Sequence, residues 1–221
     1  MSDGRFRALL WKDARRELRG KESIAAGVVL VLLFYVLDLF AFPTLAGAPR
    51  TAAAVLWTPL LYAAGALAGR AWAAEADRGT LELLRAAPVP LLSHGLSRWV
   101  VNLVITLALA LVGFVAGGAL FALPVTVEVA LPLALGAVGL SILASLAAAL
   151  AAQARSRDVL LPILLVPLAA PLLQAGIAAT LSALAGLPLS EARAPLLVLA
   201  AYDLVALGVS LVLWPILLEG E

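Results

Sequence analysis

The sequence predicts an all-α polytopic membrane protein with six transmembrane helices, and three observations carry that prediction. Of 221 residues, 64% are hydrophobic and only 13% are charged, whereas soluble domains carry about 25% charged residues. Apolar segments of about 20 residues, the length that crosses about 30 Å of hydrocarbon, recur along the chain. The basic residues fall almost entirely in alternate connections between those segments. The chain therefore lacks the polar surface that a water-soluble fold needs.

An amphipathic elbow helix is predicted over residues 1–22. The segment is charged throughout and lacks the apolar core and small-residue cleavage site of a signal peptide. Basic residues occupy much of the surface of this predicted helix. Its apolar residues recur at near-helical spacing: Phe6, Leu9, Leu10, Ala14 and Leu18. Such a helix lies in the headgroup plane. It is either a simple membrane anchor or an element that also contacts a cytoplasmic partner.

The transmembrane domain is predicted to cover residues 23–218, with its spans placed by the length of apolar sequence. These spans are residues 23–42, 51–69, 99–121, 130–152, 159–185 and 195–218. The fifth is too long for one untilted helix and contains Pro162, Pro167 and Pro171. We therefore expect a kink in this span, or a short external re-entrant piece before Pro188.

The distribution of basic residues predicts the orientation. Of the 15 Lys and Arg residues, all except Arg50 and Arg193 lie in the N-terminal segment or in the connections between spans two and three and between spans four and five. Basic residues collect in cytoplasmic connections. These three segments are thus predicted to be cytoplasmic, and an even number of spans returns the C-terminus to the same side.

The connection 70–98, between spans two and three, is the only polar stretch of substantial length. Gly79 can end or bend a helix, and Thr80 can cap the next one. Leu81, Leu84 and Arg85 would then share one helical face, until Pro88 ends the helix. This pattern predicts a short capped helix across the cytoplasmic mouth of the bundle, suited to receiving force from a soluble motor. An ordinary solvated connection is the alternative.

Common catalytic and metal motifs are missing from the sequence. There is no Cys, so disulfides and thiolate sites are excluded, and His94 is the sole histidine, which excludes bis-His haem ligation within one chain. We expect His94 to be an exposed or interface residue of the cytoplasmic connection, not a metal ligand. No phosphate loop, Gly-x-Ser-x-Gly elbow or His-Glu-x-x-His site occurs. A non-catalytic chain that borrows its ATPase is therefore predicted.

Two acidic residues fall near the outer parts of spans one and six, Asp38 and Asp203. A carboxylate within the membrane costs about 2.5–3.5 kcal/mol on insertion scales, so each needs a partner, a proton or water. We expect hydrogen bonds between helices or pairing with Arg50 and Arg193. A proton path is the alternative, but the spans do not supply an obvious chain of further acids.

Two stretches of sequence carry a family resemblance. Glu75 to Pro90, with its acidic start, Gly-Thr-Leu-Glu, Leu-rich turn and Pro, resembles the coupling-helix segment of type-2 ABC exporter permeases. Arg155 to Leu173, with its three prolines, resembles the entry to the fifth span in the haem exporter protein B (CcmB) family. The similarity runs the whole length of the chain, although Ala74 to Arg78 carries fewer acids than that region does in many members.

The resemblance implies a permease subunit of the cytochrome c maturation system, in the bacterial cytoplasmic (inner) membrane. Its implied partners are an ATP-binding subunit, a haem-handling membrane protein, a periplasmic haem chaperone, a second copy of the chain and membrane lipid, but no nucleic acid. ATP would bind the partner and haem would be handled by the complex, so no cofactor is expected on this chain. The implied ATPase-coupling residues are Glu75, Asp77, Gly79, Thr80, Leu81, Glu82, Leu84, Arg85 and Pro88.

The sequence leaves two other functions open. The coupling segment is equally compatible with a type-2 ABC permease that exports a lipid, a drug or a polysaccharide. A secondary carrier or channel would instead show inverted repeats and broken helices with polar groups at the midplane, and those features are weak in this chain.

Overall fold

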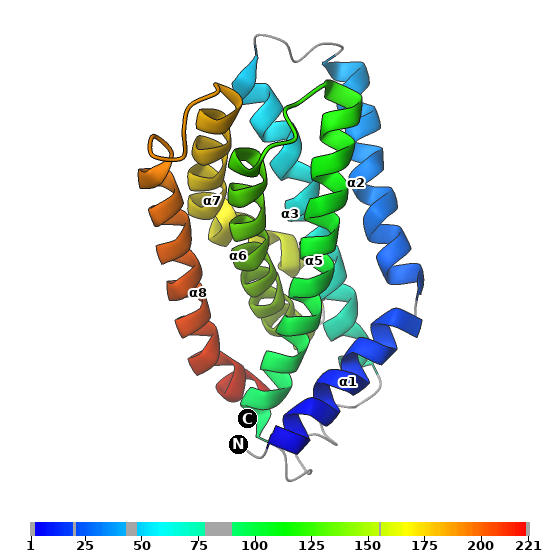
Figure 1. The fold of residues 1–221 in the computed structure, drawn as a ribbon. Coiled ribbons are helices and arrows are strands. Elements are labelled where there is room, and N and C mark those ends of the chain that lie inside the picture. Colours follow the sequence, from blue (N-terminus) through cyan, green and yellow to red (C-terminus); the bar gives the residue numbers. More distant parts are fainter. Residues whose placement is uncertain (1–2, 20, 43–47, 78–89, 155, 220–221) are drawn as a thin grey trace.

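The structure, a computed structural model, describes residues 3–19, 21–42, 48–77, 90–154 and 156–219. In this part of the chain the regular structure is helical, as predicted (Figure 1). The helices are α1 (Asp3–Arg19), α2 (Lys21–Ala41), α3 (Pro49–Ala76), α5 (Leu91–Phe121), α6 (Val127–Ala152), α7 (Arg157–Leu184) and α8 (Arg193–Glu219). All except α1 are long and apolar enough to cross a membrane.

The six long helices run roughly along one direction, α1 lies obliquely at one end of the bundle, and the end of α8 lies at that same end (Figure 1). We call this end the terminal end. The predicted spans match the helices to within a few residues at most boundaries. The exceptions lie at the terminal end, where α3 continues to Ala76 instead of ending at 69, and α5 begins at Leu91 instead of 99. These extensions carry polar residues that pair with one another.

Helix α6 forms the centre of the bundle. It packs against α3, α5, α7 and α8 (Figure 1). Its sequence is rich in Ala, Gly and Ser, and most of its residues are buried. Small side chains let neighbouring backbones approach closely, which is how helices pack in a membrane where burial of apolar surface gives little driving force. Helices α3, α5, α7 and α8 therefore surround α6, α2 packs outside them on α3 and α5, and the outer faces of the bundle expose large apolar side chains.

Helix α7 continues from Arg157 to Leu184 although it contains Pro162, Pro167 and Pro171. Each interior proline removes one helical hydrogen bond, and neighbouring helices make such losses tolerable within a membrane. After α7 the chain turns at Gly186, with φ of 72°, and passes through turns to α8 at Arg193. The described residues 185–192 thus form turns and no helical segment, and the expected kink or re-entrant piece before Pro188 stays a prediction.

The indole of Trp57 packs between α3, α6 and α7 in the core. It extends from α3 into a notch formed by Gly136 of α6 and Gly176 of α7. A Cβ atom at these two glycines would lie 2.1 Å and 2.2 Å, respectively, from the Trp57 ring atom Cη2. The indole Nε1 donates a hydrogen bond of 3.0 Å to Thr180 Oγ1. The missing side chains of both glycines thus create the space that the ring fills.

Candidate functional site

A group of charged and polar side chains is buried at the terminal end, where α1 packs against α5 and the extension of α3 lies close by (Figure 1). We call this group the basal cluster. Its members are Asp13 and Arg16 of α1, Glu75 of α3, and His94, Ser97 and Arg98 of α5. Buried charges are rare in proteins unless they are paired. The cluster is therefore the strongest candidate for a functional site among the described residues.

Glu75 joins all three helices of the cluster. Its side chain is only 1% exposed, and its Oε1 accepts hydrogen bonds from Arg98 Nη2 and, at 2.6 Å, from Arg16 Nη1. Its second oxygen, Oε2, lies 3.7 Å from His94 Nε2. One carboxylate of α3 thus holds a guanidinium from α1 and another from α5.

Asp13 is the second buried carboxylate. Its side chain is fully buried, and its Oδ2 accepts a hydrogen bond of 2.6 Å from Ser97 Oγ. Its Oδ1 lies 3.5 Å from Arg98 Nη2 and 3.2 Å from the partly exposed Lys12 Nζ. Arg98 therefore lies between the two buried acids and bears charge opposite to both.

His94 lies inside this cluster instead of on a solvated connection. Its side chain is 1% exposed, and its ring meets the Trp72 ring edge to face, with centroids 5.9 Å apart. Of the two expected positions, exposed or at an interface, exposure to solvent is wrong, because α5 already begins at Leu91 and places His94 on a helix that packs against α3. Both ring nitrogens are buried, and neither makes a hydrogen bond within the described part of the chain.

The predicted coupling residues divide into two groups. Glu75 and Asp77 are described, and Glu75 turns its carboxylate into the basal cluster. Asp77, just beyond α3, accepts two hydrogen bonds from Arg157 at the start of α7, of 2.8 Å and 3.1 Å. The other seven lie outside the described residues, and their contact with an ATPase stays a prediction: Gly79, Thr80, Leu81, Glu82, Leu84, Arg85 and Pro88.

The Asp77–Arg157 pair predicts an acid-dependent change in stability. The hydrogen bond from Arg157 lowers the pKa of the Asp77 carboxyl below its usual 3.8. Because the folded-state pKa is the lower one, the contribution of the pair is complete above about pH 4 and is lost as pH falls through the folded-state pKa. We expect the difference in Tm between the wild type and Arg157→Gln to be small and constant at neutral pH, and to shrink toward zero as pH falls through the folded-state pKa of Asp77. A difference that persists unchanged in acid would contradict the pair.

The two intramembrane acids do not find the arginine partners that the sequence suggested. Asp203 of α8 is buried against α6, where a Cβ at Gly139 would lie 2.0 Å from its Oδ1. That oxygen has no hydrogen-bond partner among the residues that the structure places. Asp38 is partly exposed near the end of α2. Within the same residues, neither acid forms an ion pair with Arg50 or Arg193, which begin helices at the end of the bundle opposite the terminal end.

Sequence reasoning missed most of the basal cluster, although a signal was present for α1. Leu9, Asp13 and Arg16 follow one another at helical spacing, so Asp13 falls within the stripe that the apolar residues define. An acid inside the buried stripe of a basic helix requires a cationic partner. The sequence does not say which arginine supplies it, because Arg98 lies far along the chain and meets Asp13 only through the packing of α1 on α5.

Six apolar helices and a charge cluster at one end define a polytopic α-helical membrane protein with an amphipathic helix at that end. The chain belongs to the CcmB protein family, whose family model matches residues 4–216. It is 32% identical over 212 residues to heme exporter protein B of Bradyrhizobium diazoefficiens, an alignment that covers 90% of each chain. The family resemblance seen in the sequence is thereby confirmed. Members of this family are membrane permease subunits of an ABC transporter that works with a separate ATPase.

Proposed function

We propose that this chain is the permease of a cytochrome c maturation system and that it couples ATP hydrolysis in a partner subunit to release of a haem-loaded periplasmic chaperone. Membership of the CcmB family and the name of the Bradyrhizobium relative, heme exporter protein B, support a role in haem export. The sequence contains no phosphate-loop motif, so the energy source is the partner. Haem is the substrate of the assembly, and the chain itself is non-catalytic.

The orientation that we propose follows from the basic residues. The terminal end carries α1 and the starts of α5 and α7, where most Lys and Arg residues lie, and it faces the cytoplasm of a bacterial inner membrane. Residues 78–89 are then on the side where a soluble ATPase is available. The haem chaperone acts at the opposite end of the bundle. A haem-handling membrane protein and a second copy of the chain complete the proposed assembly.

One observation supports the coupling role above the others: the segment between α3 and α5 is tied to the bundle at both of its ends. Glu75 precedes the segment and Arg98 follows it, and these two residues are in direct contact. Asp77, at the start of the segment, is paired with Arg157 of α7. A displacement of residues 78–89 by an ATPase therefore pulls on both helices and on α7.

The basal cluster extends that connection to α1. Arg16 binds Glu75, and Asp13 accepts a hydrogen bond from Ser97, so α1 is held to both helices that flank the coupling segment. Because both carboxylates in these contacts are buried, sliding one helix past another would leave them without partners. In our proposal α1 moves with α3 and α5 as one unit, and Glu75 takes part in coupling from inside the cluster.

The test is reconstitution with the ATP-binding subunit of the same system, followed by measurement of ATPase activity and ATP-dependent release of haem-loaded chaperone. A variant with Thr80, Leu81 and Leu84 all replaced by alanine is expected to insert normally but to lose most of the coupled release. The matched control replaces Leu197, Leu204 and Val205, exposed on the outer face of α8, by alanine. This control is expected to retain release.

Two results would separate the parts of the proposal. Normal chaperone release in the absence of this chain would overturn the haem-maturation function. Full coupling in the triple variant would overturn only the assignment of residues 80–84 as the docking helix, and the permease function would stand.

A further inference from the structure

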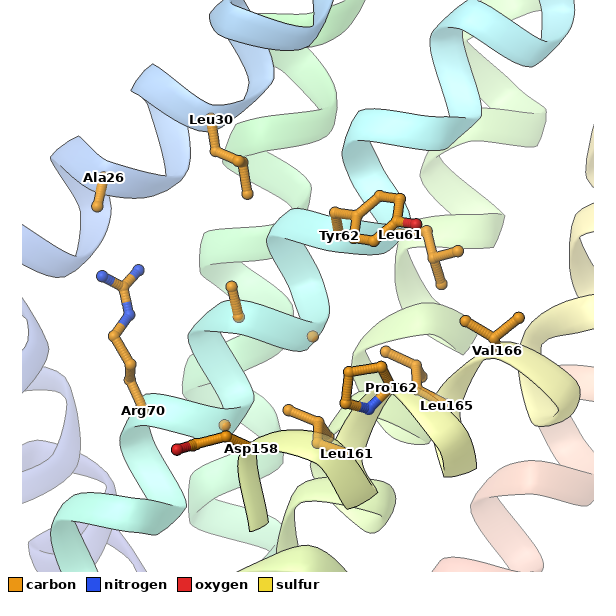
Figure 2. Close-up of a pocket in the computed structure, with 13 residues that line it drawn as sticks. Ala26, Leu30, Leu61, Tyr62, Arg70, Asp158, Leu161, Pro162, Leu165 and Val166 are labelled. Atoms are coloured by element: carbon orange, nitrogen blue, oxygen red, sulfur yellow. The ribbon is translucent and has the colours of Figure 1, made fainter. Parts of the chain in front are cut away.

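A cavity of about 510 Å³ opens on the side of the bundle between α2, α3 and α7 (Figure 2). Leu30 of α2, Tyr62 of α3 and Val166 of α7 line it. Tyr62 is 49% exposed and Val166 is 47% exposed, so the mouth of the cavity opens on the outer surface of this chain. Its volume lies within the range of about 300–1,000 Å³ that is typical of small-ligand sites.

The floor of the cavity is closed by direct contact between α3 and α7. A Cβ at Gly65 would lie 2.7 Å from Leu165 Cδ2, and a Cβ at Gly69 would lie 2.6 Å from Leu161 Cδ2. Glycine at both positions therefore lets the leucines of α7 rest on the backbone of α3. The cavity is an apolar trough with a sealed base and an open side.

Charge is confined to one end of this trough. Arg70 of α3 and Asp158 of α7 both line it, and both are exposed to some degree. In Figure 2 the Arg70 side chain follows the edge of the cavity toward Ala26, and the Asp158 carboxylate points to the same edge from the other helix. A guanidinium has five N–H donors, so Arg70 can bind an anionic group while it also contacts the protein. The end of the trough thus offers one positive and one negative group.

The length of the trough matches one leaflet. Leu61 and Arg70 are nine residues apart on α3, a rise of about 14 Å at about 1.5 Å per residue. Half of a hydrocarbon core of about 30 Å is about 15 Å. Arg70 also immediately follows the apolar stretch of α3, which places it at the boundary between hydrocarbon and headgroups. The charged end is therefore at headgroup level and the apolar part beside acyl chains.

We propose that this cavity binds one phospholipid of the leaflet at the terminal end, with a headgroup that carries both a phosphate and a free ammonium group, as in phosphatidylethanolamine. Arg70 binds the phosphate, Asp158 accepts hydrogen bonds from the ammonium, and one acyl chain lies in the trough beside Tyr62. An anionic headgroup without an amine offers Asp158 no ammonium. A quaternary ammonium such as choline has no N–H to donate. The proposal requires only that α2, α3 and α7 cross a membrane, and it does not depend on the haem system.

The full-length protein, purified in detergent, is titrated in native mass spectrometry with phosphatidylethanolamine, phosphatidylcholine and phosphatidylglycerol of identical acyl chains. We expect about tenfold tighter binding of phosphatidylethanolamine, the ratio that one additional charge-assisted hydrogen bond provides. Asp158→Asn is expected to remove this preference, and Arg70→Gln to weaken binding of all three lipids. Ala66→Trp, which fills the trough, is expected to abolish binding. Arg193→Gln and Leu204→Trp, both away from the trough, are matched controls that leave it unchanged.

Equal affinity for the three lipids in the wild type would overturn the proposal, as would an unchanged preference in Asp158→Asn. Lipid retention unaffected by Ala66→Trp would overturn it as well, and this arm holds even if Arg70→Gln fails to fold. A dimer that excludes lipid from the trough would show that a second copy of the chain, not a lipid, occupies it. None of these outcomes alters the ATPase and release assay, whose variants lie elsewhere in the chain.

Discussion

Replacing Arg98 by methionine is expected to lower the free energy of unfolding by about 3–5 kcal/mol, the usual cost of breaking a buried ion pair from one side. Arg98 lies between two carboxylates, Asp13 and Glu75, that have almost no exposed surface. Methionine keeps an unbranched apolar stem but brings no charge, so both acids remain buried with less compensation. The measurement is thermal unfolding in detergent followed by intrinsic tryptophan fluorescence, which Trp72 beside His94 makes sensitive to this region.

The matched control is Arg157→Met, which removes the same side chain from the exposed pair with Asp77. Exposed pairs contribute little because water already solvates both partners, so only a small change in Tm is expected. The double variant Arg98→Met with Glu75→Met removes charges of both signs and is expected to recover part of the loss. Equal effects of Arg98→Met and Arg157→Met would show that the basal cluster does not hold the helices together.

Replacing Trp57 by alanine is expected to cost about 3–5 kcal/mol, the range measured when a large buried aromatic side chain is removed. The ring fills the notch between Gly136 and Gly176, and its loss also leaves Thr180 without the indole donor. Neither wall of the notch can fill that space, since both are glycine. Chemical unfolding in detergent measures the cost, and weaker contact among α3, α6 and α7 is expected to increase proteolysis of the native state.

The reverse substitution tests the same geometry. Gly176→Val places a branched side chain where the Trp57 ring lies and is expected to destabilise the fold by overpacking. Gly208→Ala is the control, because a Cβ at Gly208 meets no atom within 4 Å. Combining Gly176→Val with Trp57→Ala is expected to be less harmful than the sum of the single effects. Strict additivity would mean that the ring and the glycine do not share this space.

The number of spans was predictable because one physical requirement, enough apolar length to cross hydrocarbon, acts on every transmembrane helix separately. The positions where α3 ends and α5 begins, at the terminal end, were not predictable in this way, because apolar length is required only within the hydrocarbon and not among the headgroups. Glu75 and His94 lie in helical extensions that charge pairing supports. Helix α7 continues through all three of its prolines, because neighbouring helices in a packed membrane bundle make the lost hydrogen bonds tolerable, and the kink predicted there stays a prediction.

The candidate site was predictable only where local sequence determines it. The order of residues from Gly79 to Pro88 predicts a capped helix without reference to any other part of the chain, and that helix stays a prediction. The basal cluster is non-local: Asp13 and Ser97 are joined only after α1 packs on α5. Apart from Glu75, which the family resemblance singled out for another role, its members appear in the sequence as ordinary polar residues of the N-terminal helix and of the connection 70–98. Pairing between distant helices requires their packing geometry, which the apolar pattern of a membrane protein constrains weakly because every face of a span is hydrophobic.

The central position of α6 has a consequence for how the protein is made. Each span, including α6, is apolar enough to enter the bilayer by its own hydropathy, so insertion need not wait for the neighbouring helices. Once inserted, α6 can pack against α3 and α5, which precede it in the chain, but the faces that α7 and α8 cover stay open until those helices have been synthesised. The last two spans to leave the ribosome thus complete the packing around α6, and a chain truncated before Arg157 would present the surface of α6 to quality-control proteases.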